Sequence, residues 1–194
     1  MVEQERGIRA MPEKTIIENC SPTLAGMKPA NLISLPYDNL ELAKSDIREM
    51  NGIFVRKGLR AVPLSYNKGQ VLLYIYRPDY LQKEFGKAEV RTFLQSLGYD
   101  CTDADRCVIR LGKRIRTRKS NQEFPHEIGL FLGYPLEDVE GFMQHRDVGC
   151  KCIGCWRVYG DAKRAERVFR NYRSCTSAYL RSWEMGRSLE QLTV

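Results

Sequence analysis

The sequence predicts an α+β protein in which a small mixed sheet of about four strands, including a β-hairpin, packs with six or seven helices. Two runs rich in Val, Leu, Ile and Tyr flank Asn67-Lys68-Gly69, which is typical of a hairpin, and a hairpin excludes a purely parallel sheet. Elsewhere, apolar residues recur at helical spacing between proline and glycine stops. The chain has 194 residues, of which 43% are hydrophobic, and this is enough to form the core of a single domain, which we expect over residues 11–194. We expect residues 1–10 to be a loose leader.

The first third of the chain predicts a helix, a strand and a second helix. The first helix begins near Pro12 and ends at Ser21-Pro22, because the residue before a proline avoids helical geometry. Residues 31–35 suit a short strand. Asn39 has a side chain that can cap the second helix, which ends at Asn51-Gly52.

The hairpin is followed by a long helical stretch. Pro63 interrupts the first hairpin run and favours an edge strand or a bulge, since proline cannot donate to the ladder. Helical spacing begins at Asp79, is interrupted at Gly86 and ends at Gly98. Thr102 opens the next helix. Its apolar stripe consists of Ala104, Cys107, Val108, Leu111 and Ile115.

An elbow between two short helices is predicted next. Pro125 fits the first position of a helix, which places His126 and Glu127 in its first turn. Gly133 ends that helix and Pro135 starts the following one.

The end of the chain predicts a short strand and a long helix. The strand lies in "CWRVYG", residues 155–160, and Gly160-Asp161 then caps a helix that continues to about Glu184. The predicted buried face of this helix consists of Ala165, Phe169, Tyr172, Cys175, Tyr179 and Trp183.

Composition and charge bear on where in the cell the protein is expected to be. The formal net charge of +7 permits attraction to anions but does not require it. Residues 1–10 lack the apolar segment of a secretory signal, and no apolar run is long enough for a membrane span. We therefore interpret the seven cysteines as reduced thiols and expect a cytoplasmic location.

His126 and Glu127 form the first candidate site. Free N–H groups at a helix start disfavour an imidazolium, so we expect His126 to be neutral and able to accept a proton, polarise a carbonyl or ligate a metal. Glu127 is favoured there as an anion. The alternative is structural, with His126 packed and bonded to a carbonyl. Position 130 is Leu, which excludes the H-E-x-x-H zinc motif.

A cysteine cluster forms the second candidate. "HRDVGCKCIGC" brings together four soft or borderline metal ligands, His145, Cys150, Cys152 and Cys155. Their spacing is not a standard zinc pattern. A thiol redox relay and plain apolar packing are the alternatives.

Three longer motifs resemble a known family. "CSPTLAGMKPANL", "FPHEIGLFLGYPLEDVEGF" and "GCWRVYGDAKRAERVFRNYRSCTSAYL", in this order, resemble the bacterial family catalogued as domain of unknown function 3793. The resemblance covers nearly the whole chain and implies no assigned activity. The matching positions are Cys20, Pro22, Thr23, Lys28, Pro29, Pro125, His126, Glu127, Gly129, Gly133, Tyr134, Pro135, Trp156 and Tyr159. Cys155 stands where that family pattern has a tyrosine, which suggests a packing position and counts against a family-wide metal site.

The first functional hypothesis is a small cytosolic enzyme, or a binding protein for a small anionic ligand, whether or not it catalyses a reaction. Cys20 would be the nucleophile or ligand, His126 the base and Glu127 its orienting or proton-relaying partner. The loop after the first helix and the elbow would then meet at one cleft. The remaining ligand-binding residues would be Lys28, Thr23 and Tyr134.

Two further hypotheses remain open. A metal- or haem-handling accessory protein linked to iron homeostasis would use His145 with the cysteine cluster, or Cys20 with His126. A nucleic-acid-binding module would use the basic run at 113–119 and the arginines of the last long helix, but no nucleic-acid motif is present and this partner is disfavoured. Neither G-x-G-x-x-G nor G-x-x-x-x-G-K-[ST] occurs, so the cofactor is unknown. The sequence predicts no membrane partner.

Overall fold

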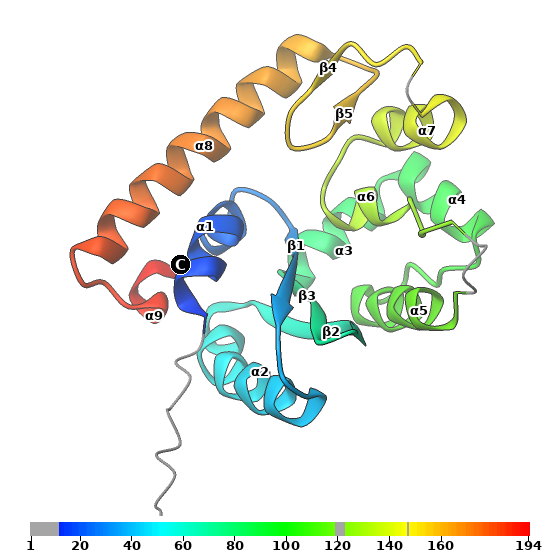
Figure 1. The fold of residues 1–194 in the computed structure, drawn as a ribbon. Helices are drawn as coiled ribbons and strands as arrows, with labels where there is room; N and C mark the ends of the chain where they lie inside the picture. Colours follow the sequence, from blue (N-terminus) through cyan, green and yellow to red (C-terminus); the bar gives the residue numbers. More distant parts are fainter. Residues whose placement is uncertain (1–11, 119–122, 147) are drawn as a thin grey trace, which may run out of the picture.

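A three-stranded antiparallel sheet lies at the centre of the molecule. A computed structural model describes residues 12–118, 123–146 and 148–194. The sheet order is β1-β3-β2, formed by β1 (Ala30–Pro36), β2 (Arg60–Asn67) and β3 (Gln70–Tyr76) (Figure 1). A second antiparallel sheet pairs β4 (Cys152–Ile153) with β5 (Arg157–Val158). The predicted α+β class is confirmed; the described pairings are all antiparallel and fall in two sheets rather than in one mixed sheet of four strands.

The β2–β3 hairpin matches its sequence pattern closely. Its two turn residues, Lys68 and Gly69, have φ angles of 48° and 73°, as a two-residue hairpin turn requires. β2 is an edge strand, and its register shifts between Pro63 and Ser65. Both structural roles predicted for Pro63, an edge strand and a bulge, are therefore confirmed.

Helices account for most of the remaining described residues. They are α1 (Glu13–Leu24), α2 (Leu40–Phe54) with the short 3₁₀ helix η1 (Val55–Lys57), α3 (Pro78–Gly86), α4 (Ala88–Ser96), α5 (Ala104–Thr117), α6 (Ile128–Phe131), α7 (Leu136–His145), α8 (Ala162–Glu184) and α9 (Leu189–Leu192). None of these helices is both long and apolar enough to cross a membrane.

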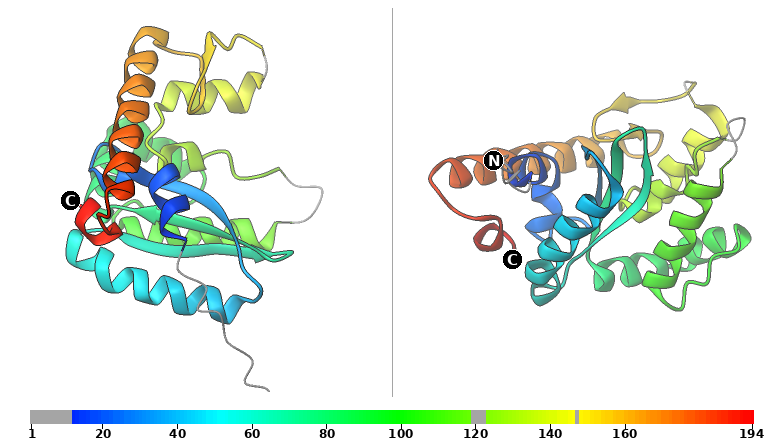
Figure 2. Two further views of the ribbon diagram at one scale, coloured as in Figure 1. Left: turned by 60° about the vertical axis from the view of Figure 1, so that its left-hand side comes forward. Right: turned by 60° about the horizontal axis from the view of Figure 1, so that its bottom comes forward.

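Helices cover both faces of the sheet (Figure 2). On β3, Val71, Leu73 and Ile75 point to a core shared with α1, α2 and α9. Tyr74 and Tyr76 point to a second core, shared with α3 to α7. Because side chains alternate between the faces of a strand, a central strand buried on both faces must be apolar at nearly every position.

Two helices continue past the residues predicted to end them. α1 includes Pro22 and ends at Leu24, and α2 passes through Asn51-Gly52 to Phe54. The side chain of Asn51 donates to the carbonyl of Ala61 and accepts from its N–H, both at 2.8 Å. Asn51 therefore ties α2 to β2, and long-range packing outweighs the local stop signal.

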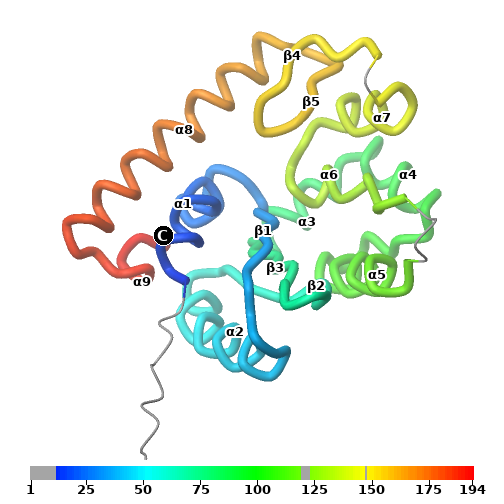
Figure 3. The backbone as a smooth tube through the Cα atoms, viewed as in Figure 1, coloured from blue at the N-terminus to red at the C-terminus, as the bar shows by residue number. Residues whose placement is uncertain are grey.

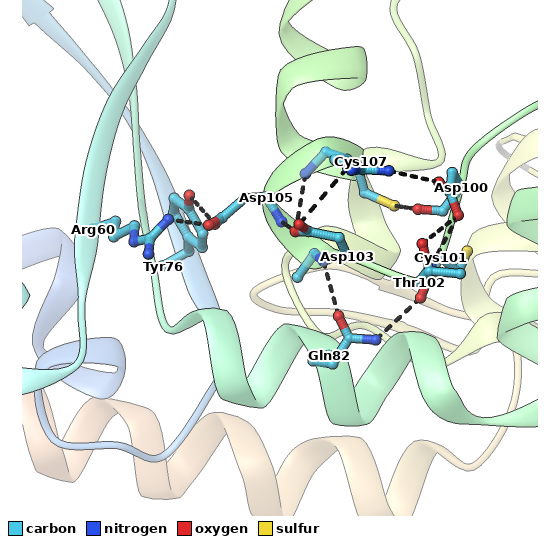
Figure 4. Close-up of polar contacts among 11 residues, drawn as sticks. Arg60, Tyr76, Gln82, Asp100, Cys101, Thr102, Asp103, Asp105 and Cys107 are labelled. Atoms are coloured by element: carbon cyan, nitrogen blue, oxygen red, sulfur yellow. Dashed lines mark hydrogen bonds and ion pairs between the residues drawn. The ribbon is translucent and has the colours of Figure 1, made fainter.

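A polar network fixes the start of α5 against the sheet (Figure 4). Asp103, rather than Thr102, is the N-cap, since its carboxylate accepts from the N–H of Asp105 at 2.7 Å. The carboxylate of Asp105 accepts from the hydroxyl of Tyr76 at 2.7 Å and pairs with Arg60. The predicted apolar stripe of this helix is entirely buried, which confirms it.

α8 lies beside α1 and extends beyond it to the β4–β5 hairpin (Figure 3). Its cap is Asp161, as predicted, with a carboxylate that accepts from the N–H of Arg164 at 2.9 Å. Only Ala165 and Phe169 of its predicted buried face are fully buried. The other four are half-buried, because a short hairpin and α1 cover less of the helix than a full layer would.

The elbow forms at the predicted glycine. Gly133 has a φ of +77°, and a Cβ placed there would lie 2.6 Å from the ring of Pro29. α6, however, begins at Ile128, so His126 and Glu127 lie in the turn before it and not in its first turn. The contact between Gly133 and Pro29 joins the loop after α1 to the elbow.

Replacing Gly133 by alanine is expected to lower the free energy of unfolding by about 2 kcal/mol, from backbone strain plus a clash with Pro29. Gly186→Ala is the matched control, because Gly186 has a φ of +91° but open space around it. That variant should lose only about 1 kcal/mol. Urea unfolding followed by circular dichroism measures both, and equal losses would mean that the Pro29 contact contributes nothing.

Candidate ligand-binding site

A cavity of about 220 Å³ lies between the α6–α7 elbow and the β4–β5 hairpin. Its wall is mainly aromatic and aliphatic, with the imidazole of His126 and the guanidinium of Arg157 among its polar groups. A concave apolar surface with a few convergent polar groups is the usual form of a small-molecule site. The lining residues are His126, Ile128, Gly129, Tyr134, Asp138, Val139, Phe142, Trp156 and Arg157.

Asp138 on α7 anchors the hairpin that closes this cavity. Its side chain is buried, and its carboxylate accepts from the indole N–H of Trp156 at 2.7 Å. The same carboxylate accepts from the backbone N–H groups of Tyr159 at 2.7 Å and Gly160 at 2.8 Å. Trp156 then stacks on Tyr134 with 4.8 Å between ring centroids. One carboxylate therefore holds the aromatic wall in place.

Glycines allow the segments around the cavity to approach closely. A Cβ on Gly129 of α6 would lie 2.6 Å from Val139 of α7. A Cβ on Gly141 would lie 2.5 Å from the ring of Tyr159, so the hairpin packs directly on the backbone of α7.

His126 lies in the wall of the cavity. Its side chain is 23% exposed, and its Nε2 is 3.7 Å from a carboxylate oxygen of Glu123. Its ring meets the ring of Phe142 edge-on, with 4.9 Å between centroids. The imidazole is therefore accessible and is oriented by an acidic and an aromatic neighbour.

Glu127 contacts a different part of the molecule. It is 2% exposed, and its Oε1 lies 2.9 Å from Nε of Arg114 on α5 and accepts from the hydroxyl of Tyr99 at 2.8 Å. Burial and the adjacent Glu127 raise the pKa of Tyr99. Among the described residues, no hydrogen bond or ion pair joins Glu127 to His126. The two adjacent side chains therefore contact different parts of the molecule, and the structure does not bring them together as a proton relay.

Lys28 contacts the elbow from the loop after α1. Its Nζ lies 5.6 Å from the ring centroid of Tyr134 and 5.6 Å from that of Tyr172. Burial lowers the pKa of Lys28 from 10.5 to about 8, against the opposing influence of Cys155 and Cys20. Of the residues predicted to meet at one cleft, Lys28 and Tyr134 are brought into contact.

Cys20 and Thr23 lie in the interior beside this loop. Cys20 is fully buried, and burial raises the pKa of its thiol to about 12. Thr23 is also buried and donates to the side chain of Asn31 at 2.6 Å. In the described part of the chain, no contact joins Cys20 to His126, and neither Cys20 nor Thr23 lines the cavity.

The predicted metal ligands are not gathered in the structure. Within residues 12–118, 123–146 and 148–194, no three His, Cys, Asp or Glu side chains are positioned to hold a metal ion. The Sγ of Cys150 donates to the carbonyl of Cys152 at 3.2 Å, Cys155 is exposed, and His145 is at the end of α7.

The profile of one protein family, described as "Protein of unknown function (DUF3793)", matches residues 16–193. The chain belongs to this family. The resemblance found in the three sequence motifs is thereby confirmed, and the family description carries no activity. No curated protein and no solved structure matches the chain.

The sequence patterns do not indicate the roles of two residues, Asp138 in the cavity wall and Tyr172 beside Lys28. Asp138 was not singled out, although it lies in the second quoted motif and its three partners lie in the third. The helical pattern predicts only that Tyr172 is buried, whereas its ring also forms one of the two cation–π contacts of Lys28. The sequence does carry one signal for Asp138. A helix of this kind is expected to pack against a neighbouring segment, and an acidic residue on its packed face must accept hydrogen bonds from buried donors.

Changing Asp138 to asparagine is expected to lower the free energy of unfolding by about 2 kcal/mol, because the new NH₂ group can face the indole N–H of Trp156. Trp156 should also become more exposed. Its emission, measured in a Trp183→Phe background, should shift to longer wavelength. Glu49→Gln, an exposed change on α2, is the control. An unshifted emission would show that Asp138 does not hold the hairpin.

Proposed function

We propose that the chain binds a small organic anion with a flat apolar part in the cavity between the elbow and the hairpin. The observation that carries this proposal is the wall itself, in which aromatic rings surround a space flanked by Arg157 and His126. The size is suitable for one ring, since an apolar cavity of about 150 Å³ can hold benzene. Arg157 suits a carboxylate or phosphate, because its planar fork matches two oxygens.

Binding is favoured over thiol catalysis. The predicted nucleophile, Cys20, is fully buried and its thiol has a raised pKa, which makes a buried cysteine unreactive. His126 is accessible but is not in contact with that thiol.

All seven cysteines are free, which supports the cytoplasmic location that we expect.

Benzoate is expected to quench the fluorescence of Trp156 in the Trp183→Phe protein, because Trp156 lines the cavity. The uncharged analogue benzamide should bind more weakly. Arg157→Gln should weaken benzoate binding by about tenfold, the loss of one charge-assisted hydrogen bond. Arg170→Gln, which removes an exposed arginine of α8 outside the cavity, is the control and should leave the affinity unchanged.

Two results would overturn the proposal. One is quenching of equal strength by benzoate and benzamide that Arg157→Gln does not alter, because the cavity would then not select anions. The other is an absence of quenching by benzoate at millimolar concentration in a protein whose Trp156 emission shows an intact hairpin.

A further inference from the structure

Lys28 is a buried cation without an acidic partner. The residue is 6% exposed. Among the described residues, no carboxylate pairs with its ammonium and no group accepts a hydrogen bond from it. The faces of Tyr134 and Tyr172 lie on the ammonium instead, and the other ionisable groups nearby are the thiols of Cys155 and Cys20.

This arrangement is costly for stability. An ammonium largely removed from water without a counter-ion loses several kcal/mol of hydration, and two aromatic faces return only about 1–2 kcal/mol each. A methionine would fill the same space between the rings without the charge. A lysine buried at such a cost is a candidate for chemistry that only an amine can perform.

The surroundings favour the uncharged amine. Burial lowers the pKa of Lys28 from 10.5 to about 8, so an appreciable fraction is free amine near neutral pH. An exposed lysine with an ordinary pKa is almost wholly protonated there. The unshared electron pair of Lys28 is thus available under conditions in which surface lysines are mostly protonated.

We propose that Lys28 is a nucleophilic amine that forms an imine with a small carbonyl compound. The nitrogen attacks the carbonyl carbon, and a proton passes from nitrogen to oxygen to give the carbinolamine. The hydroxyl then leaves as water and the nitrogen loses its second proton. Amine and aldehyde therefore give imine and water, and no oxidant or reductant is consumed.

The geometry suits a flat carbonyl compound. Two tyrosine rings flank the amine, and aromatic faces stack favourably on a planar imine. Cys155, which is exposed on the turn between β4 and β5, lies near enough to Lys28 to influence its pKa, so exposed surface is close to the amine. Tyr134 contacts Lys28 and also lines the cavity, so the two sites are neighbours. The inference does not depend on anion binding in the cavity.

Competitive reductive methylation of the folded protein tests this proposal. Limiting formaldehyde with cyanoborohydride traps imines as stable methylamines, which peptide mass spectrometry assigns to individual lysines. At pH 7, Lys28 should react at least about tenfold faster than Lys68, which is exposed in the hairpin turn, since free-amine fractions follow pKa. The rate at Lys28 should level off near pH 8.

Two controls make the outcome decisive. In the protein unfolded in guanidinium chloride, the preference for Lys28 should disappear. In a Lys28→Arg variant, which keeps the positive charge, the fast-reacting amine should be lost while the rate at Lys68 is unchanged. The proposal is overturned if Lys28 reacts more slowly than Lys68 at every pH, because the lysine is then a packed cation sealed from small carbonyl compounds.

Discussion

Arg77→Met is expected to lower the free energy of unfolding by about 4 kcal/mol, because it removes several charge-assisted hydrogen bonds from the interior. Arg77 follows β3 and is 7% exposed. Its guanidinium donates to the carbonyls of Thr23 at 2.9 Å and Leu24 at 2.8 Å, at the end of α1. It also donates to the carbonyls of Lys57 at 3.3 Å and of Val194. One side chain therefore ties α1, η1 and the segment after α9 to the sheet.

Guanidinium chloride unfolding, followed by circular dichroism, measures this loss. Arg77→Lys should be intermediate, since an ammonium can replace only part of a planar set of donors. Arg170→Met is the control, because Arg170 is exposed on α8, and it should change stability by less than about 0.5 kcal/mol. A loss at position 77 no larger than this control would show that the four carbonyls are satisfied without the arginine.

Lys28→Met is expected to act in the opposite direction and to raise the free energy of unfolding by about 3 kcal/mol at pH 7. The pKa of Lys28 is about 8 in the folded protein, against an ordinary value of 10.5. Below pH 8 the folded protein therefore carries the full cost of a buried ammonium. Between pH 8 and 10.5 the unfolded chain binds the proton that the folded protein has lost, so the wild type gains stability as pH rises.

The difference between the two proteins should shrink as pH rises from 7 through 8 to 9. Comparing the proteins is necessary because other groups around Lys28 also titrate in alkali. Burial raises the pKa values of Cys20, Tyr134 and Tyr172 to about 12, and these groups lower the stability of both proteins above their ordinary pKa values. Urea midpoints at each pH give the result. A difference that stays constant with pH, or a less stable variant at pH 7, would contradict it.

Features encoded by neighbouring residues could be predicted from the sequence. The caps Asn39 and Asp161 are such features, because each side chain accepts a hydrogen bond from an N–H only three residues ahead. The hairpin turn and the buried stripe of α5 also depend on short-range periodicity. The edge strand and the bulge at Pro63 could be predicted for the same reason, since the missing N–H is a property of proline itself.

The site depended on contacts between distant segments and was therefore only partly predictable. The sequence predicts that Lys28 and Tyr134 line one cleft, and the two side chains are in contact, but Glu127 lies beside Arg114 and not beside His126. No local pattern indicates on which side of the chain each of two adjacent polar residues lies. Asp138 was missed because its three donors lie on another segment, 18 to 22 positions later.

The placement of α9 has a consequence for synthesis on the ribosome. Leu189 and Leu192 complete the same apolar interior as Ile16 and Ile17 of α1, although α1 emerges from the ribosome far earlier. Until α8 and α9 have been translated, the nascent chain therefore leaves part of the apolar surface of α1 uncovered. A chaperone that binds exposed apolar segments of growing polypeptides would have that part of α1 as its target during this interval.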